Sequence, residues 1–199
     1  MTPTTTADVD FESEPVLTPA GHRLLDAAST LFYDRGIRAV GVDRIAEEAG
    51  TTKKTLYDCF GSKDALVALY LRRRAIRWQE FLRDRLDNSG EGNGVERVRQ
   101  VFAAAEKWHE SSDRGCAFVN AYAEVGGAND PALTLIHAEK RWMNELFRRL
   151  AREAGVADPD TAGNLLHLIY EGAMVQATAG GEPDAIGRAR AAVVDILGH

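Results

Sequence analysis

Several patterns are missing from this 199-residue sequence, and each absence narrows the class of protein. Runs of Val, Ile and Thr that alternate with polar residues are missing, which disfavours β-strands, whereas Ala, Leu, Arg and Glu are abundant. No apolar stretch approaches the ~20 residues that span a bilayer, and the first residues lack the apolar core of a signal peptide. We therefore expect an all-helical protein with no membrane span.

Cysteine is scarce, because the sequence contains only Cys59 and Cys116. The two residues show neither a CxxC motif nor the Cys/His spacing of a metal site. Isolated cysteines of this kind fit a reducing compartment. We expect a cytoplasmic protein with no structural metal and no cofactor.

The formal net charge is −6, which by itself disfavours nucleic acid as a partner. The distribution of charge matters more, because phosphate binding needs a local basic surface and not a basic protein. Residues 61–85 hold seven basic residues against three acidic ones, whereas residues 1–17 hold four acidic residues and no basic one. The arginines of the basic segment could bind phosphate or form a solvated or salt-bridged face, and we expect the latter: Arg72, Arg73, Arg74 and Arg77.

The first half of the chain predicts an acidic arm and four helices. Residues 1–17 are polar and rich in Thr, as in a disordered and inert arm. Thr18-Pro19 then supplies a helix cap, and Gly36 ends the first helix. Two short helices follow, the second of which begins at Thr52 after a turn at Gly50. Ser62 caps a long fourth helix that continues to about Leu86.

Beyond a Gly-rich loop at Asp87–Gly94, the pattern predicts five more helices. Gly pairs and two Asp-Pro pairs, each a helix cap followed by a first-turn proline, separate them. Their expected ranges are Val95–Ser111, Cys116–Val125, Pro131–Ala154, Asp160–Thr178 and Pro183–Leu197. The whole chain is thus expected to form about nine helices.

The segment Val42–Phe60, VDRIAEEAGTTKKTLYDCF, carries the clearest chemistry. A short helix, a tight Gly turn and a polar, basic second helix form the arrangement with which proteins place one helix in the DNA major groove. Lys53 and Lys54 at the start of the second helix can reach guanine edges or phosphates, and Thr55 can reach a thymine methyl group. Lys63, in the next helix, suits a backbone phosphate that fixes register without specifying sequence.

The longer segment GIRAVGVDRIAEEAGTTKKTLYDCFGSKDAL resembles the N-terminal domain of the TetR family of transcriptional regulators. The resemblance covers roughly residues 22–69. It rests on a Gly that ends helix one, Ile-Ala in helix two, an Ala-Gly turn, Thr-Leu-Tyr, Phe and Ser-Lys-Asp-x-Leu. The matching residues are Gly36, Ile45, Ala46, Ala49, Gly50, Thr55, Leu56, Tyr57, Phe60, Ser62, Lys63 and Leu66.

This resemblance implies a homodimeric, ligand-responsive repressor that binds a palindromic DNA operator. It also implies three parts, namely the arm at 1–17, a helix-turn-helix domain at 18–65 and a helical ligand-binding and dimerisation domain at 66–199. Carried over by position, the DNA contacts are Gly41, Thr52, Lys53, Lys54, Thr55, Tyr57 and Lys63. The sequence departs from the family pattern at Gly41, Thr51, Asp58 and Cys59, so we expect fewer phosphate contacts than in a typical relative.

The C-terminal half predicts a small-molecule effector site and a dimer interface. Sites between helices are mostly apolar with few polar groups, which suggests an apolar or aromatic effector. The same residue types also form ordinary cores, so each candidate has that alternative. The candidates are Phe102, Trp108, Phe118, Asn120, Tyr122, His137, Trp142, Met143, His167, Tyr170 and Met174. The last two helices carry apolar faces wide enough for both a core and an intersubunit four-helix bundle.

Two other classes of protein remain as alternatives. An enzyme could use Cys116 with His109 or His137 as nucleophile and base, or His167 with Glu171. No glycine loop, metal-ligand set or nucleophile elbow accompanies these pairs, so we expect no catalysis. A helix-turn-helix protein without a small-molecule ligand, constitutive or controlled by a partner, is the second alternative, and a fully packed C-terminal core would favour it.

Overall fold

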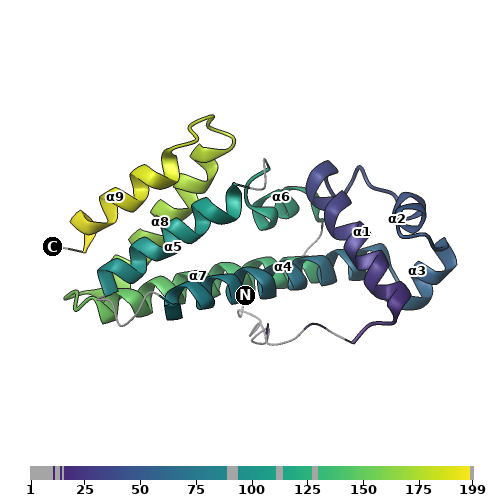
Figure 1. Cartoon of the computed structure of the whole chain (residues 1–199), viewed down its shortest axis with the longest axis horizontal. Coiled ribbons are helices and arrows are strands. Elements are labelled where there is room, and N and C mark those ends of the chain that lie inside the picture. The colour runs from purple at the N-terminus through teal and green to yellow at the C-terminus, as the bar shows by residue number, and fades with distance from the viewer. Residues whose placement is uncertain are drawn as a thin grey trace, which may run out of the picture. The chain divides into compact units, whose positions relative to one another are not determined.

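The computed structural model describes residues 11, 14, 16–88, 94–110, 114–126 and 130–197. Within these residues all regular secondary structure is helical, and the expected all-α fold with nine helices is confirmed (Figure 1). The helices are α1 (Pro19–Arg35), α2 (Val42–Glu48), α3 (Lys53–Phe60), α4 (Lys63–Asn88), α5 (Gly94–His109), α6 (Ala117–Glu124), α7 (Pro131–Glu153), α8 (Pro159–Ala177) and α9 (Ala185–Ile196).

The helix ends follow the capping residues in the sequence. Thr18 Oγ1 accepts a hydrogen bond from Gly21 N at 3.1 Å, and Ser62 Oγ accepts one from Ala65 N at 3.0 Å. Each satisfies one of the amide groups that a first helical turn leaves without a partner. The observed ends lie within two residues of the expected ones, except that Ser111, the expected end of the fifth helix, lies outside the described residues.

The chain forms two compact units, and two of the three boundaries between them fall inside long helices. Unit 1 contains Met1–Arg77 and Ala117–Glu139, and unit 2 contains Trp78–Cys116 and Lys140–His199. Helix α4 therefore contributes its first part to unit 1 and its second part to unit 2, as does α7. These units group the chain differently from the expected functional division at residues 65 and 66, which stays a prediction.

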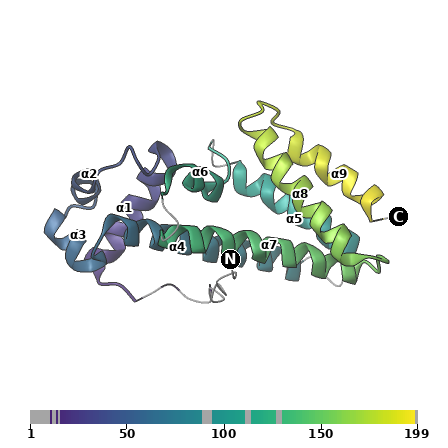
Figure 2. The ribbon, with the colours of Figure 1, turned by 180° about the vertical axis from the view of Figure 1, so that it is seen from behind.

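In unit 1, helices α1, α2 and α3 pack against one another, as Figure 2 shows from behind. Their common core contains Leu24, Ile45 and Leu56, which are fully buried. Arg23 Nε on α1 donates to the carbonyl of Ala49 at 3.2 Å, where α2 ends. Burial of apolar side chains together with this bond to the helix end holds α2 against α1.

Two residues before α1 pack against the rest of unit 1. Phe11 is buried, and the Glu14 carboxylate accepts a hydrogen bond from Arg73 Nε at 3.1 Å. Arg73, only 5% exposed, also pairs with Asp26 on α1. A buried guanidinium needs such partners, because desolvation of an unpaired charge is costly. At Phe11 and Glu14 the expected inert arm is therefore packed against the protein; residues 1–10, 12, 13 and 15 lie outside the described residues.

In unit 2, α9 packs against both α5 and α8. The core contains Phe102, Met143 and Phe147, each with no exposed surface. Gly163 on α8 lies so close to α7 that an added Cβ would be 2.5 Å from Arg148 Cα. The absence of a side chain at this position lets the two helices approach each other. Among the described helices, none has the combined length and apolar character that a bilayer crossing requires.

Candidate DNA-binding surface

Helix α3 is held in place from its buried side and presents its start to solvent. Gly50, with φ of +59°, makes the turn from α2, and Leu56 is fully buried. Thr52 caps the helix, since its Oγ1 accepts from Thr55 N at 3.1 Å. Lys53, Lys54 and Tyr57 are exposed. The expected helix, turn and helix are thus present, and the first turn of α3 is accessible.

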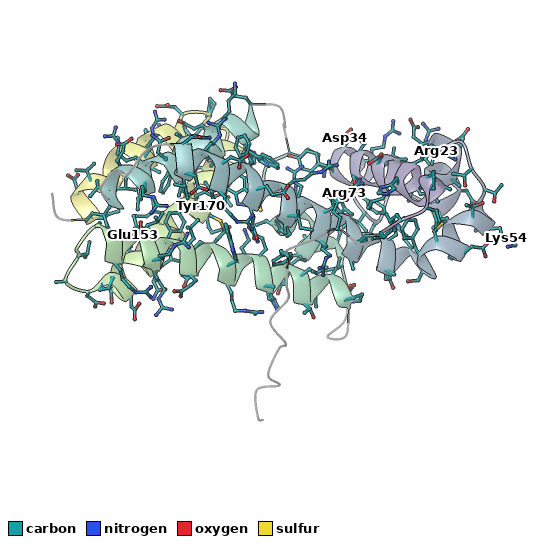
Figure 3. All side chains as sticks on the ribbon, turned by 60° about the horizontal axis from the view of Figure 1, so that its bottom comes forward. Arg23, Asp34, Lys54, Arg73, Glu153 and Tyr170 are labelled. Carbon is teal, nitrogen blue, oxygen red and sulfur yellow. The ribbon has the colours of Figure 1, made fainter. Side chains whose placement is uncertain are left out.

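Both lysines of α3 have carboxylate partners. Lys53 Nζ lies 3.1 Å from Asp43 Oδ2 on α2, and Lys54 Nζ lies 2.6 Å from Asp58 Oδ2 within α3. Figure 3 shows Lys54 projecting from the ribbon into solvent. Exposed ion pairs contribute only ~0–1 kcal/mol, so a phosphate can displace the carboxylates at little cost. The pairs orient the two ammonium groups without removing them from the surface.

Lys63 occupies a different environment from the other predicted contacts. Its Nζ donates to the carbonyl of Ile37 at 2.6 Å and lies 5.9 Å from the centre of the Phe32 ring. Burial lowers the pKa of Lys63 from its ordinary value of 10.5, and the charges of Asp64 and Glu124 oppose part of that shift. An ammonium group has three N–H donors, so two remain for a phosphate.

Gly41 precedes α2 without a side-chain cap, as its lack of a hydroxyl requires. Nothing lies within 4 Å of the position that a Cβ would take, so the surface there is open. Asp43 was not singled out from the sequence. Its pairing with Lys53 follows from the way α2 packs on α3, and the separation of ten positions conceals it in the sequence.

The candidate effector residues do not all lie in one unit. Phe118, Asn120, Tyr122 and His137 belong to unit 1, whereas the other seven belong to unit 2: Phe102, Trp108, Trp142, Met143, His167, Tyr170 and Met174. In unit 1, Phe118 is buried, whereas Tyr122 is 59% exposed and its ring centre lies 6.3 Å from that of His137. The assignment of these residues to an effector site stays a prediction.

In unit 2, aromatic side chains form a connected buried group. The ring centres of Phe102, Phe147 and Tyr170 lie 5.6–5.9 Å apart, and Tyr170 lies among the helices in Figure 3. Trp78 Nε1 donates to Met143 Sδ at 3.3 Å. Such contacts are those of a packed core, because aromatic pairs at this separation attract one another.

Trp142 lines a surface hollow of about 350 Å³ in unit 2. Charged residues supply most of its lining: Arg83, Asp87, Arg97, Glu145, Arg149 and Glu153. Leu146 adds an apolar contact beside Trp142. A lining of this kind is more polar than the apolar effector site that the sequence predicts.

Polar candidates in unit 2 form a chain of contacts. His167 Nε2 lies 3.3 Å from Glu171 Oε1, and Lys140 Nζ donates to the same oxygen at 2.8 Å. The Lys140 ammonium also lies 3.5 Å from Cys116 Sγ. Within the described residues, no group of three or more His, Cys, Asp or Glu side chains is placed to hold a metal ion. The Lys140 ammonium thus lies between a carboxylate and a thiol.

Comparison with known protein families matches both halves of the chain. Residues 24–70 match the family described as bacterial regulatory proteins, tetR family. Residues 94–193 match the family described as tetracyclin repressor-like, C-terminal domain. The first match contains every predicted DNA contact.

Individual relatives are also transcriptional regulators. The HTH-type transcriptional repressor KstR2 of Mycobacterium tuberculosis is 35% identical over 151 residues, which are 72% of each chain. The HTH-type transcriptional activator FasR of Mycolicibacterium smegmatis is 34% identical over 93 residues, which are 47% of this chain and 42% of FasR. The chain spans less than half of the length of FasR and of several other curated relatives that it matches.

A solved structure extends the likeness over nearly the whole fold. The crystal structure of SCO4454, a TetR-family transcriptional regulator from Streptomyces coelicolor, superposes with a TM-score of 0.81 and 30% identity. The superposition covers 94% of this chain and 96% of SCO4454. With both halves matched to family models and the fold shared, the chain belongs to the TetR family of DNA-binding transcriptional regulators.

Proposed function

We propose that this chain is a ligand-responsive repressor that binds a palindromic operator as a homodimer in the bacterial cytoplasm. The exposed first turn of α3 carries the proposal, because Lys53, Lys54 and Tyr57 stand there on a helix whose opposite face is buried. The N-terminal end of such a helix contacts base edges and favours a phosphate. Lys63 and Gly41 flank it as backbone contacts.

A second copy of the chain is the proposed partner of α8. Leu165, Leu168 and Val175 are 43%, 70% and 46% exposed, and their spacing places them on one face of that helix. Gly172 lies on the same stripe with open space around it. Exposed apolar side chains in a row favour burial against another surface, and TetR-family regulators form homodimers. Leu166, Met174 and Val193, by contrast, are buried within the subunit.

A two-fold dimer determines the form of the operator. It presents two α3 helices related by the same axis, so the two half-sites are inverted copies about 34–36 Å apart. We therefore expect a palindrome with half-sites one helical turn apart. Repression is favoured over activation by the likeness to KstR2, a repressor, over 72% of the chain, although FasR is an activator.

The DNA-binding proposal is tested by selecting operator DNA from a random pool with the wild-type protein. The variant Lys53→Ala with Tyr57→Ala should lose sequence-specific binding while the dimer stays folded. The control Lys107→Ala removes an exposed lysine on α5 and should bind as the wild type does. A double variant that selects the same sequences would overturn the assignment of α3.

The proposed effector is an apolar or aromatic small molecule bound among the C-terminal helices. Its binding displaces α4, changes the separation of the two α3 helices and lowers operator affinity. By linkage, operator DNA must lower effector affinity by the same factor. The alternative, regulation without a small molecule, is favoured by the absence of exposed surface on Phe102, Met143 and Phe147.

Tryptophan fluorescence distinguishes these two possibilities. All three tryptophans, Trp78, Trp108 and Trp142, belong to unit 2, so their emission reports on that unit. Aromatic acids, alkylbenzenes and long-chain fatty acids are titrated first for a fluorescence change and then for an effect on operator affinity. A compound that saturates the fluorescence change but leaves operator affinity unchanged contradicts the switching mechanism.

A further inference from the structure

Helix α6 holds the turn between α1 and α2 through two reciprocal hydrogen bonds. The Glu124 carboxylate accepts from Arg38 N through Oε2 at 2.8 Å. In return, Arg38 Nε donates to the main-chain carbonyl of Glu124 at 2.7 Å. These residues are 86 positions apart in the sequence, and Figures 1 and 2 both show α6 beside the end of α1.

Both bonds satisfy groups that would otherwise lack partners. Glu124 is the last residue of α6, and no N–H group within a helix donates to its final carbonyls. The Arg38 guanidinium also brings positive charge to the negative end of the helix dipole. In the turn, the Arg38 amide gains the Glu124 carboxylate as its acceptor. Each element therefore caps the other.

Gly36 leaves the space that the carboxylate occupies. Its φ of +91° lies in the region that favours glycine, and an added Cβ would be 2.9 Å from Glu124 Oε1. The family resemblance treats this glycine as the end of helix one. In this chain it also admits the Glu124 side chain to the turn.

The same turn is held from a second side by α4. Lys63 Nζ binds the carbonyl of Ile37, the residue between Gly36 and Arg38. The turn continues to Gly41, where α2 begins, and α2 packs against α3. The turn therefore connects α6 with the helices that carry the predicted DNA contacts.

We propose that Glu124 is the positioning residue that couples α6 to the DNA-binding helices. This inference rests on the proposed function, since it names how the DNA-binding surface is regulated. Glu124 does not contact DNA in this mechanism; it fixes the turn before α2. Because coupling is reciprocal, operator bound at α3 must also change the stability of α6.

Hydrogen–deuterium exchange with and without selected operator DNA tests the coupling. In the wild type, operator should slow amide exchange in α3, in residues 36–41 and in α6. In Glu124→Ala, protection of α3 should persist while the response of α6 disappears. Glu124→Gln keeps an oxygen acceptor for Arg38 N and should retain much of the response. Glu110→Ala, which removes an exposed carboxylate paired with Lys107, is the control.

A measurement without DNA keeps this inference separate from the proposed function. In the free protein, the Arg38 amide should exchange at least about tenfold faster in Glu124→Ala than in the wild type, because a bond to a charged acceptor is lost. Circular dichroism confirms that the variant is folded; if it is not, Arg38→Lys, which withdraws the Nε–H donor to the Glu124 carbonyl, replaces it in the measurement of the α6 response to operator.

The outcomes separate the two ideas. An unchanged Arg38 exchange rate in Glu124→Ala, or an α6 response to operator as large as in the wild type, overturns the role of Glu124. Failure of the wild type to select any operator overturns the proposed function instead, while faster Arg38 exchange still supports the contact between α6 and the turn.

Discussion

Lys54 and Asp58 lie one turn apart on α3, with 2.6 Å between Lys54 Nζ and Asp58 Oδ2. The anionic member of this pair stands on the surface that is predicted to meet phosphates. A carboxylate there both competes for the lysine and repels DNA. We therefore expect Asp58 to weaken the affinity of α3 for DNA.

Asp58→Asn should therefore tighten operator binding by roughly threefold to tenfold at low salt. This factor corresponds to the ~1 kcal/mol that an exposed charge can contribute. The gain should shrink as salt screens the charges. Fluorescence anisotropy with labelled operator at two salt concentrations measures it. Glu110→Gln, which neutralises an exposed carboxylate just after α5, should show no gain. Equal affinities of Asp58→Asn and wild type would contradict the assigned orientation of α3.

Leu168→Glu should dissociate the dimer, because Leu168, at 70% exposure, is the most exposed residue of the apolar face on α8. Two carboxylates placed at a two-fold interface repel each other and lose their hydration. Sedimentation velocity should show a monomer, and operator affinity should fall with it. The control Val119→Glu adds a carboxylate at a 42% exposed valine on α6 and should leave the dimer intact. A dimeric Leu168→Glu protein would show that another face forms the interface.

Two glycines of α8 should respond in opposite ways to substitution by alanine. At Gly163 a Cβ would lie 2.5 Å from Arg148 Cα, so Gly163→Ala forces α7 and α8 apart and should cost about 1–3 kcal/mol of unfolding free energy. At Gly172 nothing lies within 4 Å, and alanine favours the helix by up to ~1 kcal/mol. Urea denaturation compares the variants, with monomeric Leu168→Glu as the background so that dimerisation does not contribute. Equal stabilities would refute the close approach of the helices.

Glu171 should make part of the stability dependent on pH. Burial raises the pKa of its carboxyl, but His167 and Lys140 outweigh burial, so the pKa lies below its ordinary value of 4.5. A carboxyl with a lowered folded-state pKa stabilises the protein above pH 4.5, and this contribution is lost as pH falls below that value. Glu171→Gln should flatten the decline in unfolding free energy below pH 4.5. Glu182→Gln, at an exposed pair with Arg188, should leave the decline unchanged.

Local chemistry in the sequence predicted most of the helices and the first turn of α3. Thr18, Ser62 and Thr52 each cap a helix, because the hydroxyl oxygen accepts a hydrogen bond from the amide three residues further on. This pattern is visible in the sequence. Gly50 takes the positive φ that the turn requires. Capping and periodicity are local properties, and residues that are close in sequence decide them.

Contacts between distant residues could not be predicted in this way. Arg73 was expected on a solvated or salt-bridged face, and only the packing of α4 on α1 buries it between Glu14 and Asp26. Likewise, Glu124 and Arg38 carry no pattern that links them across 86 residues. The apolar residues of α8 divide into buried Leu166 and exposed Leu168 only once the other helices of unit 2 cover one side.

The sequence by itself thus determined the helical class, the helix-turn-helix and the chemical nature of its exposed face, because periodicity, capping and turn formation depend on neighbouring residues. Only the tertiary structure decided which charges are paired, which apolar side chains of α8 stay exposed, and that α6 holds the turn before α2. Those relationships depend on the packing of helices that are far apart in the chain, and packing depends on the shapes of all the side chains together.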